Sequence, residues 1–333
     1  MNPRKFIVTI IFFAFVLAAV ACAAVPPASA PTVTPVAPTL APTATIPPTT
    51  APTATPIAVT VTDSANRTVT IAGTPQRIVS LAPSTTEIAF ALGLGSRVVA
   101  VDTYSDYPTE VKALPHFKTY PLNLEQLISF KPDLVLAAGI TQPDEIKKME
   151  ELKLTVLVVG VTDTTFEQVF ADIAVMGKAT ATEAKAEQVV GAMKQQVEAI
   201  KAQVATAKAK PRVYWELDAT NAAKPFTPGP GSFINDMIVL AGGVNVAGDA
   251  KSTWAQINAE EVVAANPDVI ILSDVAYGIT VESVKSRKGW TVINAVKADK
   301  VFPIEDSLVS RPGPRVGDGL AAAAKLIHPE LFQ

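Results

Sequence analysis

The stretch RIVSLAPSTTEIAFALGLGSRVVAVDTYSDYP, residues 77 to 108, predicts a strand, a helix and a second strand. Its start is rich in β-branched side chains, and the apolar run after Pro83 ends at Gly93. Ser84 and Glu87 have the spacing of a capping box, and glycine commonly ends a helix. Ligands of open α/β sheets bind beyond the carboxyl ends of the strands. The side chains expected at such a crevice are those of Ser84, Thr85, Tyr104 and Tyr107.

Past Pro211 the pattern begins again, which predicts two similar lobes. The run RIVSL at 77–81 corresponds to RVYWE at 212–216, and NLEQLISFKPDLVL at 123–136 corresponds to NAEEVVAANPDVII at 258–271. Both pairs are 135 residues apart (212 − 77 and 258 − 123). Alternating strands and helices in each half indicate parallel sheets covered by helices. The expected fold class is therefore α/β with two lobes, and the cleft between them is a favoured place for a ligand.

A long helix is expected between the two halves. Apolar residues recur at helical spacing from residue 181 to about 208, with Lys and Gln on the outer side. Thr180 and Glu183 have the spacing of a capping box at its start, as Thr164 and Glu167 do for the preceding helix. A coiled coil is the alternative, but the apolar stripe lacks bulky residues over enough heptads. We favour a helix that bridges the lobes.

The N-terminus predicts export and attachment to a membrane. Arg4 and Lys5 precede an uncharged run, residues 6–21, which has the length of an export signal and is short for a membrane span. Cys22, the only cysteine, follows Ala-Val-Ala, small residues of the kind that precede the lipidated cysteine of bacterial lipoproteins. Simple cleavage and an uncleaved anchor are the alternatives. We expect the body outside the cytoplasm, anchored to the outer face of the cell membrane.

A segment made mainly of Pro, Thr and Ala follows Cys22 and carries no charge. Because Pro-rich chains extend by ~3.1 Å per residue, it could place a domain up to ~100 Å from its anchor. The segments expected along the chain are the export signal with its lipoprotein-type cysteine (1–22), the Pro/Thr-rich tether (23–57), the N-terminal lobe (58–176), the bridging helix (177–210) and the C-terminal lobe (211–333).

The composition argues against several functional classes. A net charge of −3 gives no basic surplus for nucleic acid. Two histidines and one cysteine are too few for the usual transition-metal sites, so no metal and no cofactor is expected. The sequence has no phosphate-loop motif, and a Ser/His/Asp site would need His116 or His328, of which the second lies in the terminal segment. We expect a monomeric binding protein rather than an enzyme; a cryptic hydrolase and a sensor or scaffold lipoprotein are the alternatives from other classes.

The repeat places matched side chains in the two lobes. An aromatic residue precedes each Asn-x-Glu helix start, Tyr120 in the first lobe and Trp254 in the second, and the pair could hold a flat ligand from both sides. Core packing is the alternative for each aromatic. Glu125 and Glu260 are matched as well; they either compensate the helix dipole or offer one carboxylate per lobe to a basic partner.

Further candidates lie at the ends of predicted strands in the second half. Arg311 follows the last predicted strand, where it could pair with an acidic group of the ligand, whereas Arg315 is expected to bind its own lobe. A closing helix is expected at residues 316–327. The remaining candidates for ligand contact are Trp215, Phe226 and Asp306.

In the motifs just quoted, the chain resembles the solute-binding proteins of ABC importers for cobalamin and ferric siderophores, most closely the cobalamin-binding members. The resemblance covers nearly everything from Thr60 onward and includes YSDYP at 104–108, KPDLV at 131–135 and FTPG at 226–229. It implies two Rossmann-like lobes bridged by one long helix, a ligand held between the lobes, and small opening movements.

The resemblance also implies roles for single residues. Trp254 falls on a cleft tryptophan of the cobalamin-binding members, and Tyr120 falls near another. Asp306 and Arg311 match polar ligand contacts, and Glu125 and Glu260 fall on the glutamates that dock on arginines of the permease. The partner is then an ABC permease dimer with its ATPase subunits. The expected ligand is cobalamin or a related corrinoid, with a ferric siderophore or haem as the alternative.

Overall fold

The computed structural model describes residues 58–161 and 163–332. The expected export signal, the lipidation site at Cys22 and the whole of the expected tether (23–57) lie outside these residues. In the part of the chain that is described, no helix combines the length and the hydropathy needed to cross a membrane.

The N-terminal lobe is built on a five-stranded parallel sheet with the strand order β5-β4-β3-β6-β7. The chain runs outward from β3 in one direction and then in the other, so a crevice opens at the carboxyl ends of β3 and β6. An antiparallel hairpin precedes the sheet, and its residues alternate between exposed and buried along β2. The strands are β1 (Ala58–Thr62), β2 (Thr68–Ala72), β3 (Ile78–Ser80), β4 (Val98–Asp102), β5 (His116–Phe117), β6 (Leu134–Ala137) and β7 (Val156–Val158).

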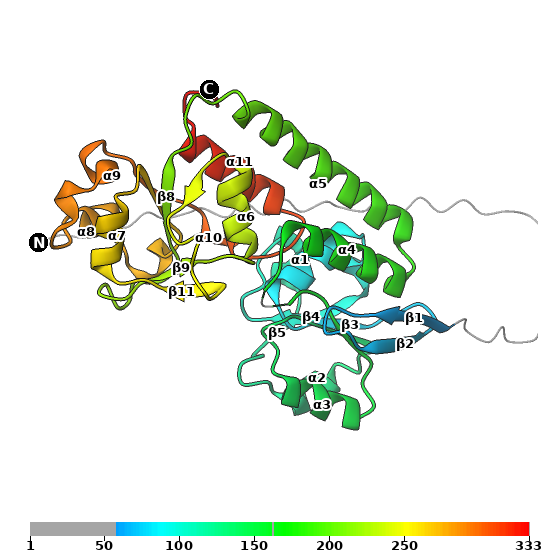
Figure 1. Cartoon of the computed structure of the whole chain (residues 1–333). Helices are drawn as coiled ribbons and strands as arrows, with labels where there is room; N and C mark the ends of the chain where they lie inside the picture. Colours follow the sequence, from blue (N-terminus) through cyan, green and yellow to red (C-terminus); the bar gives the residue numbers. More distant parts are fainter. Residues whose placement is uncertain (1–57, 162, 333) are drawn as a thin grey trace, which may run out of the picture. The chain divides into compact units, whose positions relative to one another are not determined.

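Helices cover both faces of this sheet. Successive side chains of a strand point to opposite faces, so Ile78 packs in one apolar cluster and Val79 in another. The first cluster includes residues of α1 and α4 and the second those of α2 and α3, which lie on opposite sides of the sheet in Figure 1. The helices of the lobe are α1 (Pro83–Ala91), α2 (Leu124–Ser129), α3 (Pro143–Glu151) and α4 (Phe166–Thr180), with 3₁₀ turns at Gly95–Arg97 and Thr109–Ala113.

The C-terminal lobe repeats this arrangement on a four-stranded parallel sheet of order β10-β8-β12-β13. Its strands are β8 (Arg212–Glu216), β10 (Val244–Asn245), β12 (Val269–Leu272) and β13 (Val301–Pro303), beside an antiparallel pair of β9 (Phe226–Pro228) and β11 (Trp254–Gln256). Its helices are α6 (Phe233–Leu240), α7 (Ala259–Ala265), α8 (Val281–Lys285), α9 (Asn294–Lys297), α10 (Asp306–Val309) and α11 (Val316–Ile327), with 3₁₀ turns at Val275–Tyr277 and Trp290–Val292. The closing helix lies where the sequence predicts it.

The structure confirms the internal repeat at the level of hydrogen bonds. The carboxylate of Asp133 accepts the backbone N–H of Arg77 at 2.9 Å, and that of Asp268 accepts the N–H of Arg212 at 3.0 Å. The matched asparagine before each helix is also its N-cap, since Asn123 accepts an N–H of α2 and Asn258 one of α7. The same local chemistry therefore joins strand and helix at both places.

The bridging helix is α5 (Glu183–Val204), shorter at both ends than the sequence predicts. It packs against α4 of the N-terminal lobe and against α11 of the C-terminal lobe, as Figure 1 shows. Its buried residues Met193, Val197 and Ile200 belong to the same apolar cluster as residues of both lobes. The helix therefore bridges the lobes, and the coiled-coil alternative is wrong for the described chain.

None of the three capping boxes predicted from the sequence forms among the described residues. In α1 the N-cap is Ala82, Pro83 occupies the first turn, and Ser84 and Glu87 are both buried, so no side chain caps the helix. Thr165, and not Thr164, caps α4. Thr180 lies in the last turn of α4, because Ala181 adopts a left-handed conformation (φ 57°) that ends this helix.

Candidate functional site

A buried ion-pair cluster joins the two lobes. The carboxylate of Glu87 in α1 is 2 % exposed and accepts hydrogen bonds from two arginines of the C-terminal lobe. Arg315 donates to both of its oxygens, at 2.6 and 2.8 Å, and Arg311 donates to one at 3.1 Å. The sequence-based expectation that Arg315 binds its own lobe is therefore incomplete: it donates to the Ser307 carbonyl there, but its charge is paired across the cleft.

The loop after β4 adds further contacts to both arginines. Arg311 donates to the Asp106 carboxylate at 2.6 Å and to the Tyr104 carbonyl at 3.3 Å, and the hydrogen bond from Arg311 lowers the pKa of Asp106. The guanidinium of Arg315 lies 4.2 Å from the centre of the Tyr107 ring. Arg311 thus already has two carboxylate partners in the protein, which argues against the expected pairing with an acidic ligand group.

A second contact between the lobes lies at the start of α4. The backbone N–H of Phe166, at the first position of α4, donates to the carboxylate of Asp236 in α6 at 3.3 Å. A negative charge at a helix N-terminus is favourable, although burial raises the pKa of Asp236. The lobes are therefore joined by this contact as well as by the ion-pair cluster.

A cavity of about 340 Å³ lies between the lobes. Its N-terminal wall is formed by residues that follow the strands β3, β6 and β7, namely 82–84, 138–140 and 159–161. The C-terminal wall consists of Phe233, Trp254 and residues 310–312. The strand ends thus meet the cavity at the crevice that the sheet order predicts. Among the described residues that line it, Arg311 is the only charged one.

Thr164 lines the cavity and was missed as a site residue. Its side chain is 1 % exposed, and its hydroxyl has no hydrogen-bond partner in the part of the chain that is described. The sequence analysis takes Thr164 as the cap of α4, but Thr165 has that role because it accepts the Gln168 N–H at 3.2 Å. A buried hydroxyl without a partner is costly, which makes Thr164 a candidate for a hydrogen bond that the described residues do not supply.

Three of the predicted ligand contacts line this cavity: Ser84, Trp254 and Arg311. Two others are core residues in this structure. Trp215 is fully buried and donates from its indole to Ser273 at 3.2 Å, and Thr85 is fully buried with its hydroxyl 2.7 Å from that of Ser80. Each lies at the end of a strand or in a first helical turn, but its side chain points into its own lobe.

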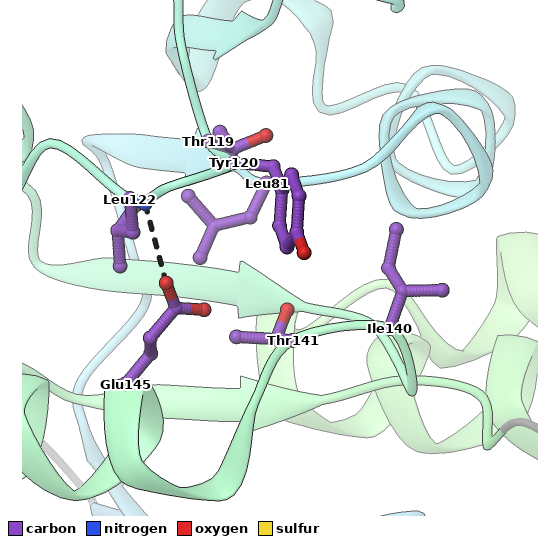
Figure 2. A pocket seen from close by; sticks show the side chains of 7 residues that line it. All are labelled: Leu81, Thr119, Tyr120, Leu122, Ile140, Thr141 and Glu145. Carbon is purple, nitrogen blue, oxygen red and sulfur yellow. Dashed lines mark hydrogen bonds between the residues drawn. The ribbon is translucent and has the colours of Figure 1, made fainter.

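The remaining predicted contacts lie outside the cavity lining. The Tyr104 side chain and the Phe226 ring are exposed, and Tyr107 stacks on Arg315. Asp306 accepts a hydrogen bond from Ser310. Ser310 lines the cavity, so Asp306 contacts a lining residue without lining the cavity itself. Tyr120 is 75 % exposed and lines a smaller pocket beside the cleft, drawn in Figure 2.

The matched glutamates lie away from the cavity, in the first turns of α2 and α7. Both side chains are exposed, and neither Glu125 nor Glu260 forms an ion pair with a described residue. Each lobe therefore presents a free carboxylate at the same place of its repeat.

Comparison with known proteins identifies relatives of the whole body of the chain. A family model described as periplasmic binding protein matches residues 78–308. An uncharacterized ABC transporter substrate-binding lipoprotein of Bacillus subtilis, YvrC, is 37% identical over 271 residues, covering 80% of this chain and 85% of the relative.

Two solved structures share both the fold and more than a quarter of the aligned residues with this chain. The periplasmic vitamin B12 binding protein of Vibrio cholerae is 27% identical with a TM-score of 0.66, and 78% of this chain and 99% of that chain are covered. A protein of Staphylococcus epidermidis described as a possible iron-binding, periplasmic solute-binding protein is 31% identical with a TM-score of 0.68, covering 76% of this chain and 99% of that one.

The ion-pair cluster yields a stability prediction. Replacing Glu87 with alanine (Glu87→Ala) leaves two half-buried guanidinium groups without their shared partner, which should lower the free energy of unfolding by about 3 kcal/mol. Chemical denaturation measures the change. The exposed Glu110 is the matched control, and Glu110→Ala should stay within about 0.5 kcal/mol of the unmodified protein. Equal effects of the two substitutions would contradict a structural role for the cluster.

Proposed function

Because the chain belongs to the periplasmic binding protein family and is a substrate-binding protein of an ABC transporter, we propose that its ligand is cobalamin or a related corrinoid. The ligand is held between the lobes and passed to the permease. The vitamin B12 binding relative supports this choice, since it matches over nearly its whole length.

The charge of the cavity is the observation that carries the choice of ligand. Arg311, the one charged residue in the described part of the lining, is already neutralised by Glu87 and Asp106. A tricatecholate ferric siderophore or the propionates of haem would bring negative charge into this site without a free cation to receive it, which is unfavourable. The periphery of a corrin ring carries neutral amides, which need hydrogen bonds and apolar contact instead. In our proposal, Trp254 provides the apolar contact and the hydroxyl of Thr164 provides a hydrogen bond.

The size of the cavity sets how such a ligand is held. A corrinoid is larger than a space of about 340 Å³, so in our proposal one edge of the ring enters the cavity and the rest lies over the rim. Exposed aromatic side chains at Tyr104, Tyr120 and Phe226 are the rim contacts that we propose.

We further propose that the protein binds its ligand without chemical turnover. Of the two histidines, His116 contacts the carbonyls of Asp102 and Val111, and His328 contacts Glu330 and the carbonyl of Gly242. Neither lines the cavity, so neither can serve as a base there.

Delivery to the permease is assigned to Glu125 and Glu260. They are exposed, have no ion-pair partner among the described residues and are repeated in both lobes, as a docking surface for two equivalent basic sites of a permease dimer requires. Attachment through a lipid on Cys22, at the outer face of the cell membrane, completes the proposal.

Ligand identity is tested by tryptophan fluorescence. Micromolar cobalamin should quench the emission of the purified protein, whereas an anionic ferric siderophore and haem should not bind at that concentration. Free tryptophan with the same additions corrects for absorption of light by the ligands. Absence of binding to cobalamin, or tighter binding to a ferric siderophore, would overturn the corrinoid proposal and favour the iron-carrying alternative.

The hydroxyl of Thr164 is tested with a variant of similar shape. Thr164→Val should weaken cobalamin binding about five- to tenfold, the value of about one neutral hydrogen bond, without loss of stability, because the hydroxyl has no partner in the described protein. Thr227 is the matched control, since its hydroxyl is also buried and unpartnered but does not line the cavity. Thr227→Val should leave affinity unchanged, and an equal loss in both variants would refute the assignment.

Docking is tested by charge reversal. Replacing both glutamates, Glu125→Lys and Glu260→Lys, should abolish ligand uptake by cells that carry the permease while the affinity of the purified protein for the ligand is retained. Glu151→Lys and Glu282→Lys, which reverse two other exposed helix carboxylates, serve as the control for added positive charge. Uptake that survives the double reversal would rule out this role.

A further inference from the structure

A side pocket lies beside the cleft, within the N-terminal lobe. Its volume is about 170 Å³, and Ile140 separates it from the cleft cavity because this residue lines both spaces. Leu81 at the end of β3 and Leu122 before α2 contribute apolar walls (Figure 2). The pocket and the cleft cavity are therefore neighbours, so a group attached to a ligand in the cleft lies next to the pocket.

The pocket contains one carboxylate with unused hydrogen-bonding capacity. Glu145 accepts the backbone N–H of Leu122 at 3.2 Å and that of Gln142 at 3.4 Å, both longer than the usual 2.9 to 3.0 Å. A carboxylate offers about four lone-pair positions. In Figure 2 the carboxylate of Glu145, the hydroxyl of Thr141 and the ring of Tyr120 lie around the same space.

We propose that this side pocket is a subsite for one hydrogen-bond-donating arm of the ligand, and that Glu145 selects against an acidic arm. The inference rests on the proposed function, and for a corrinoid the arm is a primary carboxamide. Its N–H groups would donate to Glu145 in a charge-assisted hydrogen bond while the leucines contact its methylene groups. A carboxylate arm of the same length would meet Glu145 with like charge.

A purely structural role for Glu145 makes a different prediction. Glu145 lies at the third position of α3, where a carboxylate stabilises a helix start, and this role would persist with any ligand or with none. Selection between amide and acid arms is therefore the readout that separates the two roles, since a helix cap does not sense the ligand.

The experiment compares dissociation constants for cobalamin and for the monocarboxylates made by hydrolysing one of its side-chain amides. The unmodified protein should bind at least one monocarboxylate about tenfold or more weakly than cobalamin. Glu145→Gln, which keeps the shape and an acceptor, should reduce that ratio to about twofold. Glu151→Gln in the same helix, outside the pocket, should keep the original ratio.

A second variant keeps the test independent of the stability of α3. Thr141→Phe fills the pocket without altering Glu145, and it should weaken cobalamin binding and remove the discrimination as well. If the unmodified protein binds cobalamin but discriminates no monocarboxylate, or if Glu145→Gln discriminates as strongly as the unmodified protein, the subsite inference alone is overturned. If cobalamin does not bind at all, the proposed function fails, and the inference fails with it.

Discussion

The carboxylate of Glu87, buried at the lobe interface, is the constraint on which the site depends. It comes from the first turns of the helix that opens the N-terminal lobe, and it receives two guanidinium groups from one loop of the C-terminal lobe. The free-energy cost of removing this carboxylate from water is offset only because both guanidinium partners are present. The pairing holds the cavity wall at Arg311 and neutralises the one charge in the described part of that wall, so the same interaction sets the geometry of the cleft and supports the proposed neutral ligand.

The two lobes are repeats, but they do not contribute equally to the ligand site. The N-terminal strand ends, at Leu81 and residues 138–140, open onto the cleft cavity and the side pocket. The matched position to Leu81 is Glu216, which is fully buried and forms a bidentate ion pair with Arg287 at 2.5 and 2.8 Å. Burial, followed by the charge of Glu216, also raises the pKa of the neighbouring Asp274 to about 6. The C-terminal crevice is thus filled by its own charged network, and the ligand contacts of that lobe come from Phe233, Trp254 and residues 310–312 instead.

Local sequence predicts much of the fold and little of the site. The repeat, the parallel sheets, the bridging helix and the bounds of α11 follow from periodicity and from caps such as Asn123 and Asn258. Glu87 could not be identified in this way, because its spacing from Ser84 fits a capping box and its partners lie more than 220 residues away. Likewise, Trp215 lies in β8 and Trp254 begins β11, and only tertiary packing decides that the first is a core residue and the second lines the cavity.

The contacts across the cleft differ in how readily they can break, which limits how ligand can enter. Asp106, which pairs with Arg311, is largely exposed. An ion pair with such a partner contributes at most about 1 kcal/mol to the free energy that holds the lobes together. The hydrogen bonds to Glu87 are buried, and the apolar cluster around α5 is continuous through both lobes. Breaking the former would leave a buried charge without its partners, and separating the latter would expose apolar side chains to water. Movement that admits a ligand is therefore expected to break the contact between Asp106 and Arg311, while both arginines stay bound to Glu87 and α5 keeps its place. Such a movement changes the cleft mouth and leaves the strand ends of the N-terminal lobe, with the side pocket, in place.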